Sequence, residues 1–318
     1  MSSKAPATFL VIAALIAVQI LFGLNYVISK VVVEAFPPLV WASIRIIISA
    51  TLLFGFAFAF RGKHRPKGTW KTFYKPLIAL AFLGTILNQG CFLVGLSYTT
   101  PTNSAILNTL IPVFAILIVT IRGQEPASAT RLLGFLCAFS GVLILRKIED
   151  FTISNETAFG DILMILNCLF FGLFLSYGKS FLEKHDRLWT TAWLFAYGSV
   201  GLSIAALPDY STFGIPAMTP ELWGAAVFAV VGGTLLTYFL NNWALAYAKA
   251  SNVAIFVYIQ PVITMTLAWH WYGTIPTVRE VISSMIVFTG VLLVVNGGRN
   301  KSDGSGTLKR AEQEAPAS

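Results

Sequence analysis

Charged residues are scarce in this sequence. Asp, Glu, Lys and Arg make up 11% of its 318 residues, whereas 56% of the residues are hydrophobic. A soluble domain carries about 25% charged residues. The mean hydropathy is correspondingly high, at +0.74. This composition excludes an ordinary water-soluble domain and places the chain in a lipid bilayer.

Cysteine and histidine are also rare, with three of each. The cysteines Cys91, Cys137 and Cys168 all fall in apolar stretches, and an odd number of such residues does not make a disulfide framework. The histidines lie in separate segments, and the chain has neither a zinc-ligand spacing nor a phosphate-binding loop. We therefore predict no metal, no cofactor and no enzymatic activity, with a membrane-embedded enzyme as the alternative that this absence disfavours.

Long apolar runs dominate what is present. They lack the alternation of barrel strands, and each has close to the ~20 residues that a helix needs to cross ~30 Å of hydrocarbon. The sequence therefore predicts an all-α polytopic membrane protein with ten transmembrane helices. The predicted spans are 8–33, 38–60, 74–97, 101–121, 129–147, 159–181, 189–207, 221–247, 250–271 and 278–297. Residues 1–7 and 298–318 would then form short polar tails.

The second half of the chain repeats the first at a constant offset of 149 residues. Phe22-Gly-Leu recurs at Phe171, Gly84-Thr85 recurs at Gly233, and Pro112-Val113 recurs as Pro261-Val262. We expect two five-helix repeats, 8–147 and 159–297, joined by an outer linker at 148–158. Because five is an odd number, repeats with the same fold must lie upside down relative to each other, with a cavity between them near the membrane midplane.

The basic residues gather in alternate loops. The link after the second span carries six Lys or Arg residues, whereas its equivalent after the seventh span carries none. With the N-terminus inside, 17 of the 22 basic residues fall on the cytoplasmic side. The positive-inside bias therefore predicts a multi-pass cell-membrane protein with both termini in the cytoplasm, in the inner membrane if the source is prokaryotic. It also accounts for the net charge of +8 without nucleic-acid binding.

Several motifs resemble the EamA domains of the drug/metabolite transporter superfamily. They are Phe22–Lys30, Arg45 after the Pro37-Pro38 pair, and Thr100–Pro112. Leu87–Leu96 and Arg61–Pro66 are most similar to the plant-type branch of auxin and amino-acid transporters. The resemblance covers nearly all of residues 8–297. It implies ten helices in inverted repeats and transport of small organic solutes, commonly outward.

Polar side chains inside the predicted spans are candidates for solute contact, because a buried polar group is costly in a bilayer. Most of them are amides, which both donate and accept hydrogen bonds and so suit a zwitterion or a hydroxylated solute. Hydrogen bonding between helices is the alternative role for each, and helix anchoring is the alternative for Arg45. The predicted substrate-binding residues are Asn25, Arg45, Asn88, Gln89, Asn108, Asn167, Tyr177, Asn242, Trp243, Tyr258 and Gln260.

Two further pairs recur at matching positions of the repeats. Pro112 and Pro261 each remove a backbone hydrogen bond within a span, so we predict hinges there, with a purely structural kink as the alternative. Lys30 and Lys179 lie near opposite ends of the membrane and are predicted gates that attract a carboxylate. Snorkelling to the interface, or pairing with the glutamate four residues on, is the alternative for both lysines.

No Asp or Glu lies in the middle of any predicted span, which removes the simplest proton carrier. We therefore predict a secondary transporter that moves a small polar organic solute, an amino acid or a related metabolite, outward by alternating access. Proton-coupled multidrug efflux is one alternative, and a membrane receptor or scaffold without transport is another. The expected partners are the solute and the lipid bilayer, and the protein is expected to be a monomer because both repeats lie in one chain.

Overall fold

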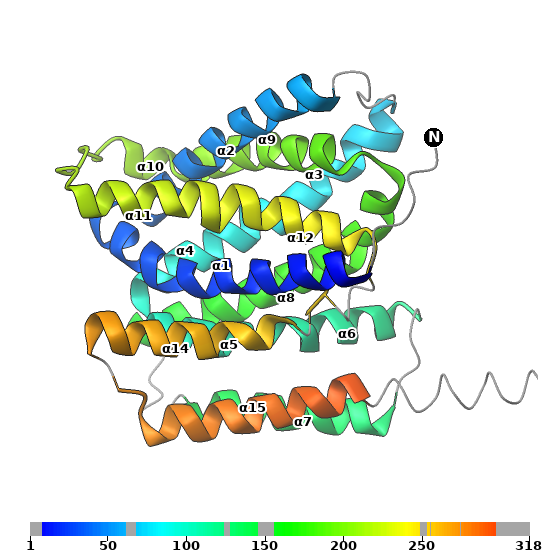
Figure 1. The fold of residues 1–318 in the computed structure, drawn as a ribbon, viewed down its shortest axis with the longest axis vertical. Coiled ribbons are helices and arrows are strands. Elements are labelled where there is room, and N and C mark those ends of the chain that lie inside the picture. The colour runs from blue at the N-terminus through cyan, green and yellow to red at the C-terminus, as the bar shows by residue number, and fades with distance from the viewer. Residues whose placement is uncertain are drawn as a thin grey trace, which may run out of the picture.

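The computed structural model shows a bundle of helical rods (Figure 1). Within the part of the chain that it describes, all regular structure is helical and no strand occurs. The described residues are 8–61, 68–123, 128–145, 156–248, 253–254, 256–273 and 275–296. The prediction of an all-α protein is confirmed for these residues.

The first half of the chain forms five rods, two of which consist of consecutive helical segments. The single rods are α1 (Thr8–Ala35), α2 (Pro38–Arg61) and α7 (Ala129–Leu145). The third rod joins two π-helices, η2 (Trp70–Tyr74) and η3 (Phe82–Leu87), with α3 (Lys75–Ala81) and α4 (Asn88–Tyr98). The fourth joins α5 (Pro101–Asn108) to α6 (Ile111–Ile121).

The second half follows the same order. It contains α8 (Glu156–Lys184), α9 (Arg187–Ala205), the short α10 (Leu207–Tyr210) and α15 (Val278–Asn296). Its third rod joins α11 (Pro220–Val230), the π-helix η5 (Val231–Leu236) and α12 (Thr237–Leu245). Its fourth joins the 3₁₀ turn η6 (Phe256–Tyr258) to α14 (Ile259–Tyr272). Each of the ten predicted spans therefore overlaps a helical rod.

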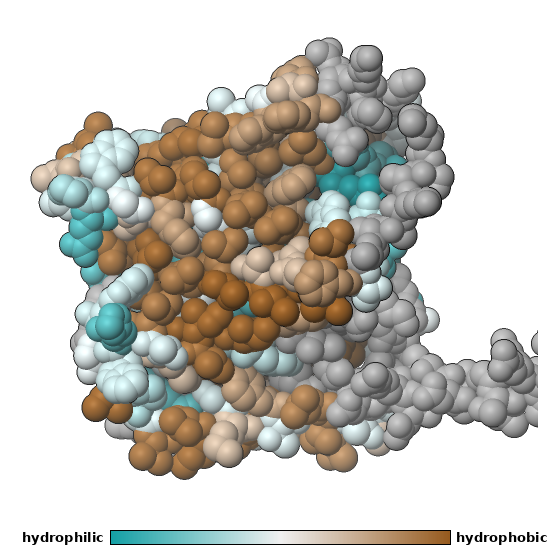
Figure 2. All heavy atoms as spheres, viewed as in Figure 1, coloured by the Kyte–Doolittle hydropathy of each residue, from teal (hydrophilic) through white to brown (hydrophobic). Residues whose placement is uncertain are grey.

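Six of the rods are long and apolar enough to cross a membrane. They are Thr8–Ala35, Pro38–Phe60, Trp70–Tyr98, Pro101–Ile121, Thr157–Lys184 and Pro220–Leu245. Among the described helices, α7, α9, α14 and α15 do not meet the same criterion of length and hydropathy. Apolar residues cover most of the face in Figure 2, as expected for a surface in contact with lipid. The protein is thus a multi-pass membrane protein.

Threonine and aspartate caps fix where several of these helices begin. Thr100 accepts a hydrogen bond from the amide of Asn103 at 3.1 Å, and Thr219 accepts one from Leu222 at 3.2 Å. A proline follows each threonine at once, which suits the first turn because its missing N–H would have no partner there. Asp186 caps α9 through the amides of Leu188 and Trp189.

The two halves pack through reciprocal contacts at glycine. Gly84 of the first half lies against Phe174 of the second half. The equivalent contact is made with the halves exchanged: Gly233 lies against Asn25, because Gly233 is equivalent to Gly84 and Asn25 is equivalent to Phe174. At the edge of the bundle the same holds for α7 and α15, where Gly141 contacts Val287 and Gly290 contacts Ala138. Contacts that recur with the halves exchanged define a pseudo-two-fold axis between them.

Equivalent rods run in opposite directions in Figure 1. The rod of α3 and α4 runs from upper right to lower left, whereas the rod of α11 and α12 runs from left to right. The pair α7 and α15 lies at the bottom of the same view, beyond α5, α6 and α14. The centre of the bundle is therefore enclosed by rods from both halves.

Candidate solute-binding site

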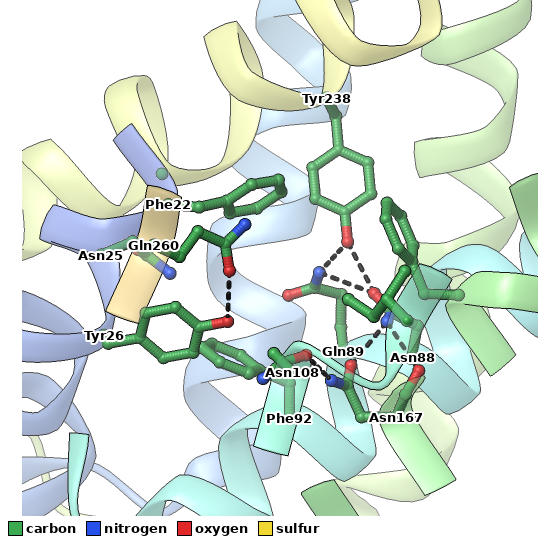
Figure 3. A pocket seen from close by; sticks show the side chains of 13 residues that line it. Phe22, Asn25, Tyr26, Asn88, Gln89, Phe92, Asn108, Asn167, Tyr238 and Gln260 are labelled. Atoms are coloured by element: carbon green, nitrogen blue, oxygen red, sulfur yellow. Dashed lines mark hydrogen bonds between the residues drawn. The ribbon is translucent and has the colours of Figure 1, made fainter. Parts of the chain in front are cut away.

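A cavity lies between the two halves, and residues from eight helical segments line it. Figure 3 shows Tyr26 and Gln260 on one side and Asn88, Gln89 and Asn167 on the other. The lining residues are Phe22, Asn25, Tyr26, Asn88, Gln89, Phe92, Asn108, Ile111, Asn167, Phe171, Gly233, Tyr238 and Gln260. The lining therefore combines amides and phenols with aromatic rings, and none of its described residues is charged.

Three pairs of lining residues are equivalent positions of the two repeats. They are Phe22 with Phe171, Gln89 with Tyr238, and Ile111 with Gln260. Gln89 Nε2 donates directly to the Tyr238 hydroxyl, although the two residues are 149 positions apart. A contact between equivalent positions can occur only on the axis that relates them. The pseudo-two-fold axis therefore passes through the cavity.

The π-helices η3 and η5 also occupy equivalent positions, and each precedes residues of the site. The segment after η3 begins with Asn88 and Gln89, and the segment after η5 begins with Thr237 and Tyr238. In η5 the hydroxyl of Thr234 donates to the carbonyl of Ala229, five residues back, at 2.6 Å. Such wide turns redirect the helix that follows and occur often at functional sites. They place Asn88, Gln89 and Tyr238 toward the cavity.

Breaks in the fourth rod of each repeat also border the cavity. The helix α5 ends at Asn108 and α6 begins at Ile111, and both residues line the space. Pro112 has no N–H, so the carbonyl of Asn108 lacks its usual helical donor. The equivalent break lies between η6 and α14, beside Gln260 and Pro261. The two prolines thus interrupt helices at the cavity, and their action as hinges stays a prediction.

A chain of amide hydrogen bonds runs along one wall. Asn88 Nδ2 donates to Asn167 Oδ1 at 2.5 Å, and Asn167 Nδ2 donates to Asn108 Oδ1 at 2.7 Å. Gln89 Nε2 donates to Asn88 Oδ1 at 3.1 Å, and the Tyr238 hydroxyl donates to the same oxygen at 2.7 Å. Each group within this chain is buried, so the bonds position the amides around the space.

A second polar cluster faces it across the cavity. The Tyr26 hydroxyl donates to Gln260 Oε1 at 2.8 Å, and Gln260 Nε2 donates to Gln19 Oε1 at 2.5 Å. The ring of Tyr26 meets Phe92 edge to face, with centroids 5.5 Å apart. This wall therefore joins α1 to α14 and offers both a hydroxyl and an amide.

Comparison with known proteins agrees with this architecture. The family model described as the EamA-like transporter family matches residues 9–147 and again residues 158–296. The chain belongs to the EamA-like transporter family. Its two matched segments correspond to the two halves that enclose the cavity, so the protein is a transporter of this type.

Among the curated relatives of this EamA-like protein, an uncharacterized transporter of Archaeoglobus fulgidus is 30% identical over 85% of this chain and 91% of its own. A WAT1-related protein of Arabidopsis thaliana is 22% identical over 93% of this chain and 86% of its own. A solved crystal structure of another protein aligns with a TM-score of 0.63 at 15% identity, covering 94% of this chain and 99% of that one. That last likeness shows the fold alone.

Six of the predicted substrate-binding residues line the cavity of this EamA-like transporter. They are Asn25, Asn88, Gln89, Asn108, Asn167 and Gln260. Arg45 lies just behind the lining, where Nη2 donates to Gln89 Oε1. The hydroxyl of Ser29 donates to Asn25 Oδ1 at 2.9 Å, which holds that amide in place from the next turn of α1.

The other four predicted residues lie outside the lining. The ring of Tyr177 is exposed and packs under the guanidinium of Arg122, 3.9 Å from its centroid. Asn242 Nδ2 donates to Thr191 Oγ1 on α9 at 3.1 Å. Trp243 packs on Tyr247, and Tyr258 packs on Phe288 of α15. These contacts lie away from the cavity, and contact of these four residues with a solute stays a prediction.

Some lining residues were absent from the predicted set. The aromatic residues among them are Phe22, Tyr26, Phe92, Phe171 and Tyr238. The repeat carried a signal for three of these, because Phe22 recurs as Phe171 and Tyr238 is the equivalent of Gln89. Phe92 and Tyr26 have no such signal, since aromatic residues are common throughout the chain.

The two predicted gate lysines make equivalent contacts in the two repeats. Lys30 Nζ donates to the carbonyls of Leu96, Ser97 and Thr99 at 3.1 to 3.2 Å. Lys179 Nζ donates to the equivalent carbonyls of Leu245 and Ala248 at 3.4 and 2.8 Å. Each lysine thereby caps the C-terminal end of the third rod of its own repeat, where the helix dipole favours a cation.

Each lysine also lies near the glutamate four residues on. Lys179 pairs with Glu183 at 2.7 Å, whereas the Lys30 to Glu34 distance is 3.9 Å. Both glutamates are exposed, so these pairs add little stability. The described contacts therefore give the lysines a capping role, and their action as gates stays a prediction.

Proposed function

We propose that this protein is a secondary transporter that moves a small polar organic solute, an amino acid or a related metabolite, out of the cell by alternating access. The observation that carries the proposal is the amide-lined cavity on the axis between the two repeats. Such a site fits a solute that binds at the midplane, between residues of both repeats.

The lining supports the proposed solute class. Its amides and phenols supply donors and acceptors on both walls, and Phe22, Phe92 and Phe171 supply apolar surface. Polar groups of this kind among apolar walls are typical of small-molecule sites. Among the described lining residues there is no carboxylate to hold a cation, which disfavours multidrug efflux of hydrophobic cations.

Alternating access is supported by the breaks in the rods. The π-helices η3 and η5 and the interruptions before Pro112 and Pro261 occur at equivalent positions, next to the same cavity. Discontinuous helices of this kind can rearrange without unfolding the rods around them. The outward direction rests on the resemblance of the motifs to transporters that commonly export.

The proposal includes ten membrane spans in two inverted repeats, with both termini in the cytoplasm. The overlap of ten rods with ten predicted spans supports the number, and the opposite course of equivalent rods in Figure 1 supports the inversion. The excess of basic residues in alternate loops supports the orientation.

Cysteine labelling tests this orientation directly. We expect Lys184→Cys, at the end of α8, to react with a membrane-impermeant maleimide only after the cells are opened. Ser211→Cys, after α10, should react in intact cells. Both positions are exposed, and Cys91, Cys137 and Cys168 would be replaced in the parent. The reverse pattern would contradict the proposed topology.

Gln260→Ala tests the cavity. We expect it to lower export about fivefold at unchanged membrane abundance, because a hydrogen bond to the solute contributes about 1 kcal/mol. The control is Thr266→Ala on the same helix, since the exposed Thr266 hydroxyl bonds only the carbonyl of Val262 in its own helix. Export would be measured as solute appearing in the medium. Equal export by the two variants would remove Gln260 from the site.

A further inference from the structure

Arg45 is a cation buried without an anion. Its side chain is 1% exposed on α2, and Nη2 donates to Gln89 Oε1, which is a neutral acceptor. Its other guanidinium atoms, Nε and Nη1, have no hydrogen-bond partner among the described residues. No described carboxylate lies within ion-pair distance of it. A buried charge in this state is costly, so helix packing alone does not explain an arginine here.

Two neutral donors flank Arg45 on α2. The indole Nε1 of Trp41 lies one turn before it and the hydroxyl of Ser49 one turn after it, on the same side of the helix. Both residues are buried, and both polar atoms also lack partners among the described residues. This face of α2 therefore presents unpaired hydrogen-bond donors around one positive charge.

We propose that Arg45, flanked by Trp41 and Ser49, is a carboxylate-binding subsite of the cavity, and that Gln89 closes it. The inference rests on the proposed transport function and specifies its solute: a small organic acid or zwitterion with one free carboxylate.

Gln89 is placed to act as this closure. Gln89 lines the cavity, and its Oε1 accepts the hydrogen bond from Arg45 Nη2. Its Nε2 donates to Asn88 Oδ1 and to the Tyr238 hydroxyl. When the Gln89 side chain turns aside, the carboxylate of a solute takes the place of the amide oxygen. The exchange is favourable because a carboxylate offers two charged oxygens to the guanidinium fork in place of one neutral oxygen.

The rest of the cavity suits the remainder of such a solute. Its apolar part would lie along Phe22, Phe92 and Phe171, and an amino or hydroxyl group would meet amide oxygens such as that of Asn25. None of the described lining residues is an acid that would compete for Arg45. A single carboxylate therefore satisfies the one charge that the described site leaves without a counterion.

Gln89→Glu tests the subsite independently of any solute, because it builds a carboxylate of the same shape beside Arg45. We expect it to raise the Tm of the purified full-length protein by at least about 3 °C. The matched control is Gln260→Glu, which places the same charge on the opposite wall, beside Tyr26 and Gln19, and should lower Tm. The gain should vanish in the double variant Arg45→Gln with Gln89→Glu.

A second arm uses acids and their uncharged amides as probes. Acetate, benzoate and L-phenylalanine at millimolar concentration would be compared with acetamide, benzamide and L-phenylalaninamide. We expect at least one acid to raise the Tm of the wild type while its amide does not. That shift should be lost in Arg45→Gln and in Gln89→Glu, where the subsite is removed or already filled.

The proposal is overturned if Gln89→Glu lowers Tm as Gln260→Glu does. It is equally overturned if no acid stabilises the wild type, if each amide acts like its acid, or if the effect of the acid survives Arg45→Gln. If one of these results is obtained and the wild type still exports a solute, the proposed function is kept and the carboxylate-binding subsite is rejected. If the acids raise Tm as expected but the wild type transports no solute, the subsite is kept and the proposed function is rejected.

Discussion

Gly290→Leu is expected to abolish the folded protein. A Cβ atom at Gly290 would lie 2.6 Å from the carbonyl oxygen of Gly134 and 2.8 Å from the Cα of Ala138, so α7 and α15 could no longer touch there. Backbone atoms cannot turn away as a side chain does, and overpacking of this kind costs ~3 kcal/mol or more. Membrane abundance, measured by fluorescence-detected size exclusion of a tagged protein, should fall to about a tenth or less.

The matched control is Gly224→Leu. Gly224 is also a helical glycine, on α11, but it is exposed, and a Cβ atom added there would meet no neighbouring atom within 4 Å. This variant should keep the abundance and the symmetric elution peak of the wild type. If Gly290→Leu matched it in both, the close contact between α7 and α15 would be wrong.

Asn167→Leu is expected to reduce export at least tenfold. The substitution keeps the branching of the side chain at Cγ but removes the amide that links Asn88 to Asn108. The Asn88 amide and the Asn108 oxygen would each lose this partner beside the cavity, at a cost of about 1–3 kcal/mol each. A lower Tm should accompany the loss of export, so flux must be compared at equal amounts of folded protein.

Asn242→Leu provides the comparison. Asn242 is also a buried asparagine within a helix, but it bonds Thr191 on α9 and lies outside the cavity lining. Thr191 keeps its hydrogen bond to the carbonyl of Arg187, so little is left unpaired. Export should therefore stay within about twofold of the wild type. Equal loss in both variants would mean that the polar network, and not the cavity, sets the rate.

The internal repeat predicted that a cavity lies between the two halves, although it was not used to predict which residues line it. Pairs such as Gln89 and Tyr238 meet because an axis that relates two halves must bring some equivalent positions together. The amides of Asn88, Asn108 and Asn167 were found for a different reason, since buried amides in lipid need partners and so gather where helices meet.

The orientation of individual side chains could not be read from the sequence. Most spans are apolar on all sides, so hydropathy does not tell which side of a helix faces the cavity. Tyr177 and Tyr258 were predicted to contact the solute because they are polar residues within spans. Tyr177 is exposed beneath Arg122, however, and Tyr258 packs on Phe288 of α15. The acceptors of Lys30 and Lys179 could likewise not be predicted from charge alone, because they are backbone carbonyls at the end of another rod.

Transport through the cavity is tested most directly by metabolite profiles of bacterial cells that express the protein. Cells with the wild type would be compared with cells that carry equal amounts of folded Asn167→Leu. We predict that one small polar solute of the amino-acid class accumulates in the medium of the wild type alone. Enrichment of that solute inside the cells would reverse the proposed direction. Identical profiles for the two proteins, inside and outside, would contradict transport through this cavity.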